Sequence, residues 1–272
     1  MTTSTEAPPT WETVPARVGS GQITFARAGQ GDPVLVLPRE NGHPPSDEFL
    51  DALAGHHTVY HPWYPGFHGG GDAADWAWLA NPRDLAVVIG QAAAKFGLER
   101  MTVIGLGFGG WLAAEIAATA GGRLSALILV APMGIRPPEG YILDQFLVST
   151  EGYARAGFAD DAAFEAVYGV EPDLAQLESW ETDREMTSRL AWKPYMHNRA
   201  LTGLLRAVET PTLVVWGEAD KVVPVGTAAL WKAALPNCTV EVIPGTGHAV
   251  NLEQPRALAS IVAPFLKAHT RV

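Results

Sequence analysis

Residues 101–120 have the sequence MTVIGLGFGGWLAAEIAATA, and this stretch decides the fold class. The short apolar run at 101–104 is typical of a buried parallel strand. Residues 109–120 predict a helix. The glycines between the two indicate a sharp turn at which strand and helix backbones approach closely. A strand that passes through such a turn into a helix is the repeating unit of a parallel α/β sheet.

The same alternation continues on both sides of this stretch. Short apolar runs predict further strands at 21–27, 34–37, 58–60, 126–130, 212–216 and 239–243, and helices are expected at 49–53, 83–96 and 255–269. Residues 136–206 show helical patterns without a clear strand, which indicates an inserted helical cap. We therefore expect an α/β core at 1–135 and 207–272, with the cap at 136–206, and a loose tail over residues 1–10.

Composition excludes several classes of protein. The 272 residues are 47% hydrophobic and carry 19 Lys and Arg against 29 Asp and Glu, a net charge of −10. The negative balance argues against nucleic acid or an anionic membrane as a partner. One cysteine, Cys238, excludes an internal disulfide and a multi-cysteine metal site. The sequence shows no apolar signal core and no apolar run of membrane length, so a cytoplasmic location is expected. A monomer or a homodimer is expected.

The turns after the predicted strands carry a family resemblance. Ligands of such sheets bind at the carboxyl ends of the strands. VWGEADKVVP at 215–224, and GH at 247–248 followed by EQP at 253–255, resemble the acid and histidine turns of the α/β-hydrolase family. The resemblance is to the smaller-capped esterase, epoxide-hydrolase and C–C-hydrolase branch, and it covers nearly all of the chain. It implies a mostly parallel eight-stranded sheet flanked by helices, with an inserted helical cap.

Three turns depart from the family pattern. Where the family's G-x-S-x-G places a nucleophile, this chain has Gly107, so no covalent acyl-enzyme is expected at that position. Pro38-Arg39 stands where the family has His-Gly, and Trp63 stands where it has Asp, ahead of GFHGG at 66–70. Three altered motifs favour natural drift or a changed chemistry over one engineered substitution.

The resemblance assigns the remaining site residues. The order 107, 220, 248 matches the family order of nucleophile, acid and base. Asp220 is expected to accept a hydrogen bond from one ring nitrogen of His248 and so orient it as a catalytic base, while the other nitrogen faces a vacant space at Gly107. The backbone N–H groups near Arg39 and Glu40, with that of Phe108, would form an oxyanion or ligand-binding pocket, to which Arg39 adds charge for a carboxylate or enolate.

Other interpretations of these residues are weaker. Gly105, Gly107 and Gly110 match the G-x-G-x-x-G dinucleotide pattern, but the following strand ends at 130–132 without an acid. His56, His57 and His61 would point to different faces of a strand, so no metal or other cofactor is expected. Nine aromatic residues crowd the predicted cap and favour a small apolar or aromatic ligand: Tyr141, Phe146, Tyr153, Phe158, Phe164, Tyr168, Trp180, Trp192 and Tyr195.

Three hypotheses of function follow. The first is a ligand-binding pseudo-hydrolase without ordinary esterase activity. The second is an enzyme that needs no nucleophile, such as a lyase, isomerase, decarboxylase or direct-water hydrolase, with His248 and Asp220 as the general base. The third is an inactive mutant of a serine hydrolase.

Overall fold

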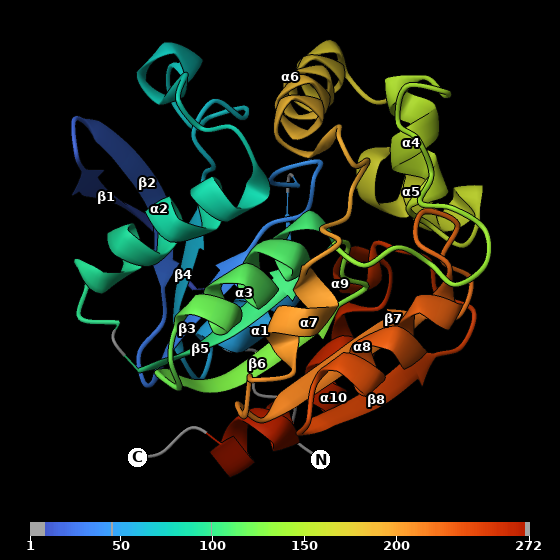
Figure 1. Cartoon of the computed structure of the whole chain (residues 1–272). Helices are drawn as coiled ribbons and strands as arrows, with labels where there is room; N and C mark the ends of the chain where they lie inside the picture. Colours follow the sequence, from blue (N-terminus) through green and yellow to red (C-terminus); the bar gives the residue numbers. More distant parts are fainter. Residues whose placement is uncertain (1–8, 45, 99, 270–272) are drawn as a thin grey trace, which may run out of the picture.

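The centre of the computed structural model is an eight-stranded sheet (Figure 1). The structure describes residues 9–44, 46–98 and 100–269, so the predicted tail lies outside it up to residue 8. The strand order is β1-β2-β4-β3-β5-β6-β7-β8. The strands are β1 (Glu12–Val18), β2 (Gly21–Ala28), β3 (Pro33–Leu37), β4 (Thr58–Pro62), β5 (Met101–Leu106), β6 (Leu124–Val130), β7 (Thr212–Gly217) and β8 (Cys238–Ile243).

The sheet is parallel from β4 to β8, whereas β2 runs antiparallel to both of its neighbours. Every residue of β5 and β7 is buried, as expected for central strands covered on both faces. The edge strands β1 and β8 alternate between buried or half-buried and exposed positions. The carboxyl ends of β3, β5, β7 and β8 therefore meet at one edge of the sheet.

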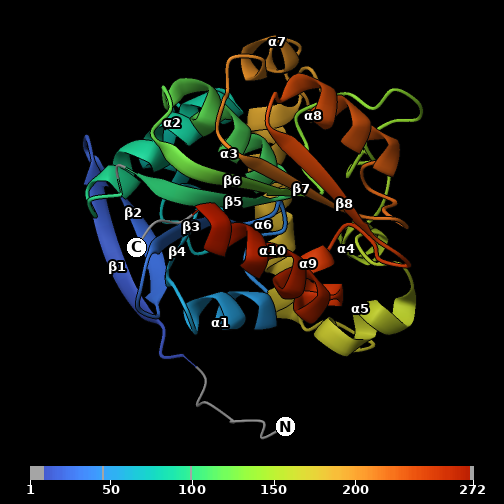
Figure 2. The same ribbon diagram turned by 90° about the horizontal axis from the view of Figure 1, so that it is seen from below.

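Helices cover both faces of the sheet, as Figure 2 shows. One face carries α2 (Pro82–Ala94), α3 (Phe108–Thr119) and α8 (Ala228–Ala234), and the other carries α1 (Glu48–Ala54) and α10 (Pro255–His269), with α9 (Val250–Glu253) beside α10. Short 3-10 helices occur at η1 (Ala73–Trp76) and η2 (Val225–Thr227). The two helical layers bury the apolar strand residues in one continuous core.

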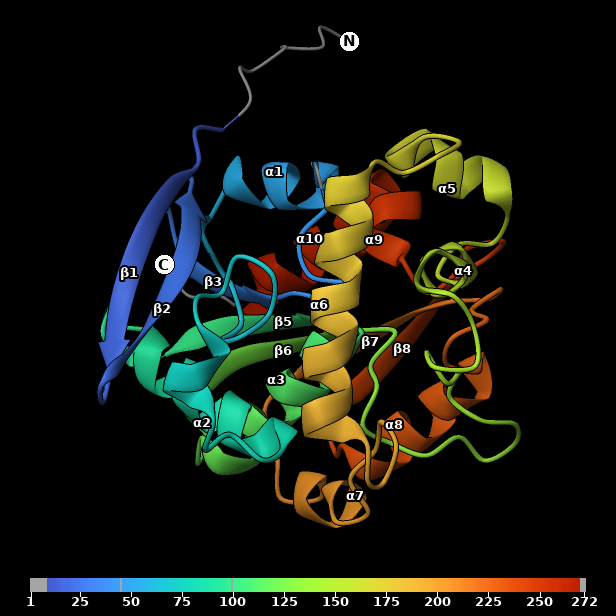
Figure 3. The same cartoon turned by 90° about the horizontal axis from the view of Figure 1, so that it is seen from above.

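The segment between β6 and β7 contains α4 (Thr150–Ala156), α5 (Asp161–Tyr168), α6 (Leu174–Ala191) and α7 (Leu201–Leu205). In Figures 1 and 3, α4, α5 and α6 lie above the carboxyl edge of the sheet, and α6 crosses over it. The helix α7 instead packs on α3 and α8 at the side of the sheet. A second, smaller cluster of buried residues joins α4, α5 and α6: Ala154, Phe158, Phe164, Trp180 and Ala249.

The predicted fold class and the strands and helices of the core are confirmed, with boundaries that differ by a few residues. The edge strand β1, the helices α8 and α9 and the two short 3-10 helices were not predicted. The edge strand β1 has no clear apolar pattern in the sequence, because it contains Pro15 and most of its residues are exposed. The seven residues of α8 are too few to show a helical period.

Gly105 provides a test of the strand-to-helix packing. A Cβ atom at Gly105 would overlap the carbonyl oxygen of Gly109 and lie 2.6 Å from Cα of Gly110. We expect Gly105→Ala to destabilise the protein by about 2–3 kcal/mol, because the backbone of α3 must move away from β5. Urea unfolding followed by circular dichroism measures this loss.

Gly90→Ala is the matched control. A Cβ atom at Gly90, inside α2, would meet no atom within 4 Å. This variant should gain about 0.5–1 kcal/mol from helix propensity. Equal stability of the two variants would contradict the close approach of β5 and α3.

Candidate functional site

Four turns at the carboxyl edge bring the predicted site residues together. Glu40 follows β3, Gly107 lies between β5 and α3, and Asp220 and His248 follow β7 and β8. His248 and Glu40 are 1% and 2% exposed, so the cluster is closed to solvent.

The turn at Gly107 has the shape of a strand-to-helix elbow. Gly107 has φ +50° and ψ −114°, a conformation that side-chain-bearing residues adopt only at a cost of about 1–3 kcal/mol. Its N–H donates to the carbonyl of Val130 at 2.9 Å, and its carbonyl accepts from the N–H groups of Gly110 and Met133 at 3.0 Å. These bonds hold the turn, and the N–H of Phe108 begins α3 directly beside it.

Asp220 orients His248. Its Oδ2 lies 2.8 Å from His248 Nδ1, and both side chains are fully buried. Asp220 Oδ1 also accepts the N–H groups of Val222 and Val223, each at 2.8 Å. The carboxylate is thereby fixed, the proton is held on Nδ1, and Nε2 faces Gly107.

The Glu40 carboxylate occupies the space that the sequence predicted to be vacant. Its Oε2 accepts the N–H of Phe108 at 3.2 Å, and its Oε1 lies 3.5 Å from His248 Nε2 and from the hydroxyl of Tyr153, which donates to it. A Cβ atom at Gly107 would be 2.6 Å from Glu40 Oε2 and 3.0 Å from His248 Nε2.

Glu40 makes a side-chain contact that the sequence did not predict. The expected backbone N–H donor near Glu40 stays a prediction, while the side chain accepts the N–H of Phe108. The physical reason is that a glycine at 107 leaves room beside a buried donor and a buried imidazole. An acceptor that fills this space removes the cost of an unpaired donor.

The charges of this cluster reinforce one another. Burial alone lowers the pKa of His248, but the charges of Asp220 and then Glu40 outweigh burial and raise it to about 9. Burial alone raises the pKa of Glu40, but the charges of His248 and then Arg39 lower it to about 2. These charges favour the imidazolium form of His248, whose Nε2 lies 3.5 Å from Glu40 Oε1 without forming a hydrogen bond.

Two contacts that the sequence did not indicate connect α6 to the loops of the site. Asp183 accepts the N–H of His68 at 2.8 Å, and burial raises the pKa of its carboxyl to about 7. The hydroxyl of Thr187 donates to the carbonyl of Glu40 at 3.5 Å. No periodic signal marks these residues, because an acid or a threonine in a helix is usually exposed.

Other candidates lie apart from this cluster. Among the described residues, no three His, Cys, Asp or Glu side chains are grouped so that they could hold a metal ion. Cys238 begins the edge strand β8. Of the aromatic residues predicted to belong to a cap, Tyr141, Phe146 and Trp192 are exposed.

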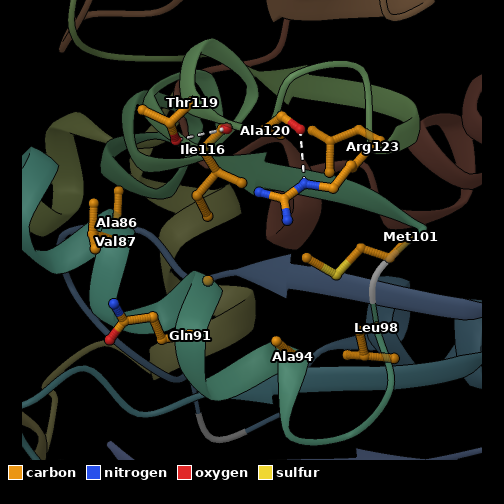
Figure 4. A pocket seen from close by; sticks show the side chains of 12 residues that line it. Ala86, Val87, Gln91, Ala94, Leu98, Met101, Ile116, Thr119, Ala120 and Arg123 are labelled. Carbon is orange, nitrogen blue, oxygen red and sulfur yellow. Dashed lines mark hydrogen bonds between the residues drawn. The ribbon is translucent and has the colours of Figure 1, made fainter. Parts of the chain in front are cut away.

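The hollow drawn in Figure 4 is not part of the site. It has a volume of about 380 Å³ and lies between α2 and α3, with Met101 and Leu124 in its lining. These two residues begin β5 and β6, so the hollow is at the opposite end of the strands from Gly107. Over the described residues, no helix is long and apolar enough to cross a membrane.

The comparisons with known proteins agree with this architecture. Residues 9–261 match the model of the alpha/beta hydrolase family, and the chain belongs to that family. It is 26% identical to monoacylglycerol lipase abhd6-A of Xenopus laevis over 204 residues, which are 66% of this chain and 59% of that protein. It is 28% identical to the dihydrolipoyllysine-residue acetyltransferase component of the acetoin cleaving system of Cupriavidus necator, over 92% of this chain and 68% of that one.

Solved structures show the same fold. A membrane phospholipase A described as a bacterial virulence factor has a TM-score of 0.77 at 20% identity, covering 97% of this chain and 88% of that one. The serine hydrolase CarC of carbazole degradation has a TM-score of 0.74 at 19% identity, over 95% and 100% of the two chains. At these identities the likeness concerns the fold alone.

The charge of His248 can be tested by pH titration. The ring should titrate near pH 9 when its Cε1 proton is followed by NMR. Because the pKa is higher than the ordinary value of about 6.5, the contribution of the protonated His248 to the stability of the folded state is fully present below that value. This stability is lost as the pH rises through about 9. A His248→Gln variant should lack this part of the pH dependence.

Glu40→Gln is the control for the cause of the shift. Removing this charge leaves Asp220 alone to favour the imidazolium, so the pKa of His248 should fall. An unchanged titration in this variant would show that Glu40 does not face the ring.

Proposed function

We propose that this protein is an α/β-hydrolase-family member without the elbow nucleophile, which binds a small apolar or aromatic ligand and does not hydrolyse esters through an acyl-enzyme. The observation that carries the proposal is the Glu40 carboxylate, held between the N–H of Phe108 and His248 where a nucleophile would lie.

Each part that ester hydrolysis needs is absent or already engaged. Gly107 has no nucleophilic atom. The Phe108 N–H, which would stabilise an oxyanion, is bonded to Glu40. The charges of Asp220 and Glu40 favour the protonated form of His248, and an imidazolium cannot accept the proton of a nucleophile. The relatives named lipase and phospholipase therefore support a shared fold more than a shared activity.

A second candidate is an enzyme that uses His248 for proton transfer without a covalent intermediate. The 2.8 Å bond between His248 and Asp220 favours it, because a pair of this kind orients a general acid or base. Since the ring is protonated in the resting state, it would first donate a proton to a carbanion or leaving group. If a lyase, isomerase, decarboxylase or direct-water hydrolase activity is found and His248→Gln leaves it intact, this candidate is excluded.

The proposal also covers the division of the chain into a core and a cap, the route of the ligand, and the location and oligomeric state of the protein. We place the helical cap at 136–206, with α4, α5 and α6 as the part that covers Gly107, and the core at 1–135 and 207–272. The ligand would enter between these helices and the sheet. A cytoplasmic monomer or homodimer without a cofactor is the simplest form of such a protein.

The first test is ester turnover by the wild type and by Gly107→Ser. The wild type should not hydrolyse p-nitrophenyl acetate, since loss of a triad serine costs about 10⁶-fold in kcat in a measured case. Gly107→Ser should also be inactive and less stable by about 1–3 kcal/mol, because the new Cβ atom requires a strained backbone. That atom would also lie 2.6 Å from Glu40 Oε2.

Gly107→Ser combined with Glu40→Gly is the informative second variant. Removing the carboxylate frees the Phe108 N–H and lowers the pKa of His248, so slow release of p-nitrophenol should appear and should require His248. Robust turnover by the wild type, or a large rescue by Gly107→Ser alone, would contradict the proposal. The second result would identify the chain as a serine hydrolase inactivated by one substitution.

A further inference from the structure

Arg39 is a buried cation without a hydrogen-bond partner. Only 6% of its surface is exposed. Within the described part of the chain its guanidinium makes no hydrogen bond and no ion pair, although it carries five N–H donors. None of its nitrogens is fully enclosed, so the guanidinium reaches a small amount of solvent, and a mostly buried charge of this kind favours an acceptor that pairs with it.

The side chain of Arg39 extends from the elbow to the space below the covering helices. Its Cγ lies 3.5 Å from the position of a Cβ atom at Gly107. At the other end of the side chain, Arg39 Nη1 lies 3.7 Å from the point that a Cβ atom added to Gly157 would occupy, and Gly157 is the C-cap residue of α4. The Cβ atom of Ala249 lies 3.8 Å from the same point beside Gly157. The guanidinium is therefore at the edge of the small cluster that joins α4, α5 and α6.

The aromatic side of this cluster carries a second unpaired donor. Trp180 on α6 is 1% exposed, and its indole Nε1 is enclosed without a hydrogen-bond partner. Tyr168 packs edge-on against Trp180 with ring centroids 4.9 Å apart. Burial raises the pKa of Tyr168 to about 12, and the main opposing influence is the charge of Arg39. Arg39 thus acts electrostatically on the same group of rings.

The nearby carboxylates do not satisfy Arg39. Asp47 accepts the N–H groups of Phe49 and Leu50 on one oxygen and the Asn251 amide on the other. Glu40 is engaged by Phe108, Tyr153 and His248. Both acids attract Arg39 over a longer range, but neither pairs with its N–H groups. The missing acceptor is therefore expected to come from outside the chain.

We propose that Arg39 binds the carboxylate of the ligand, and that the rings of Tyr168, Trp180 and their neighbours hold its apolar or aromatic body. The planar guanidinium matches a carboxylate with two parallel hydrogen bonds, which a neutral ester or amide cannot reproduce. This assignment rests on the proposed function, because it names the class of ligand for the covered site. The ligand is thus a small aryl or alkyl carboxylic acid in its ionised form.

Phenylacetate is the probe, with phenylacetamide as its neutral counterpart, in calorimetry and thermal-shift measurements at matched ionic strength. The wild type should bind phenylacetate with a millimolar Kd, as expected for a ligand of this size, and phenylacetamide much more weakly. Arg39→Met should raise the Kd about 10- to 100-fold. Trp180→Phe, which removes the N–H donor together with part of the ring, should raise it about 2- to 10-fold.

Arg155→Met is the matched control. Arg155 lies 4.2 Å above the ring of Phe164 in the same cluster, but it is already paired with Glu151 at 2.7 Å. Its loss should leave the Kd for phenylacetate within about twofold, as expected for a surface ion pair. Without ligand, Arg39→Met should be at least as stable as the wild type, because it removes an unpaired buried charge.

Three results would overturn the assignment: no saturable binding of phenylacetate to the wild type, equal affinity for phenylacetamide, or an unchanged Kd in Arg39→Met. These outcomes leave the proposed absence of esterase activity untouched. Ester turnover by the wild type would refute the proposed function, and the Kd ratio between the wild type and Arg39→Met would still be measured independently.

Discussion

The position of the His248 ring between Asp220 and Glu40 is the interaction on which the site depends. The three side chains come from turns that follow β7, β8 and β3, so their attraction joins segments far apart in the sequence. An ionised carboxylate is tolerated in a buried place only when it has charge partners and hydrogen bonds. Glu40 has both, since it faces the imidazolium and accepts the N–H of Phe108.

This interaction is possible because of the glycine at 107. A side chain there would occupy the position of the Glu40 carboxylate, and the His248 ring would face that side chain instead. The missing side chain therefore leaves room for the Glu40 carboxylate to accept the N–H of Phe108 and to lie beside the His248 ring. The chain belongs to the alpha/beta hydrolase family and has its fold, and in this chain Asp220 and His248 are in contact beside Glu40.

The sequence was sufficient for the fold because the signals involved are local. The apolar runs and the glycine turn at 105–110 are set by burial and backbone geometry, which act over a few residues. The acid turn at 215–224 and the histidine turn at 247–248 are also local, and their resemblance to the family turns, in the family order, predicted the contact between Asp220 and His248. Elements with weaker local signals, such as the Pro15-containing edge strand, were missed.

By itself, then, the sequence determined the α/β architecture, the residues gathered at the carboxyl edge of the sheet, and the lack of a nucleophilic atom at position 107. Only the tertiary structure decided that the space beside Gly107 is filled, and by which group. The orientation of the Glu40 side chain and the burial of Arg39 depend on atoms of the turn at Gly107, of α4 and its C-terminal end, and of the turn at His248. No spacing in the sequence reports such contacts, because they arise from the balance of desolvation and charge pairing in the closed site.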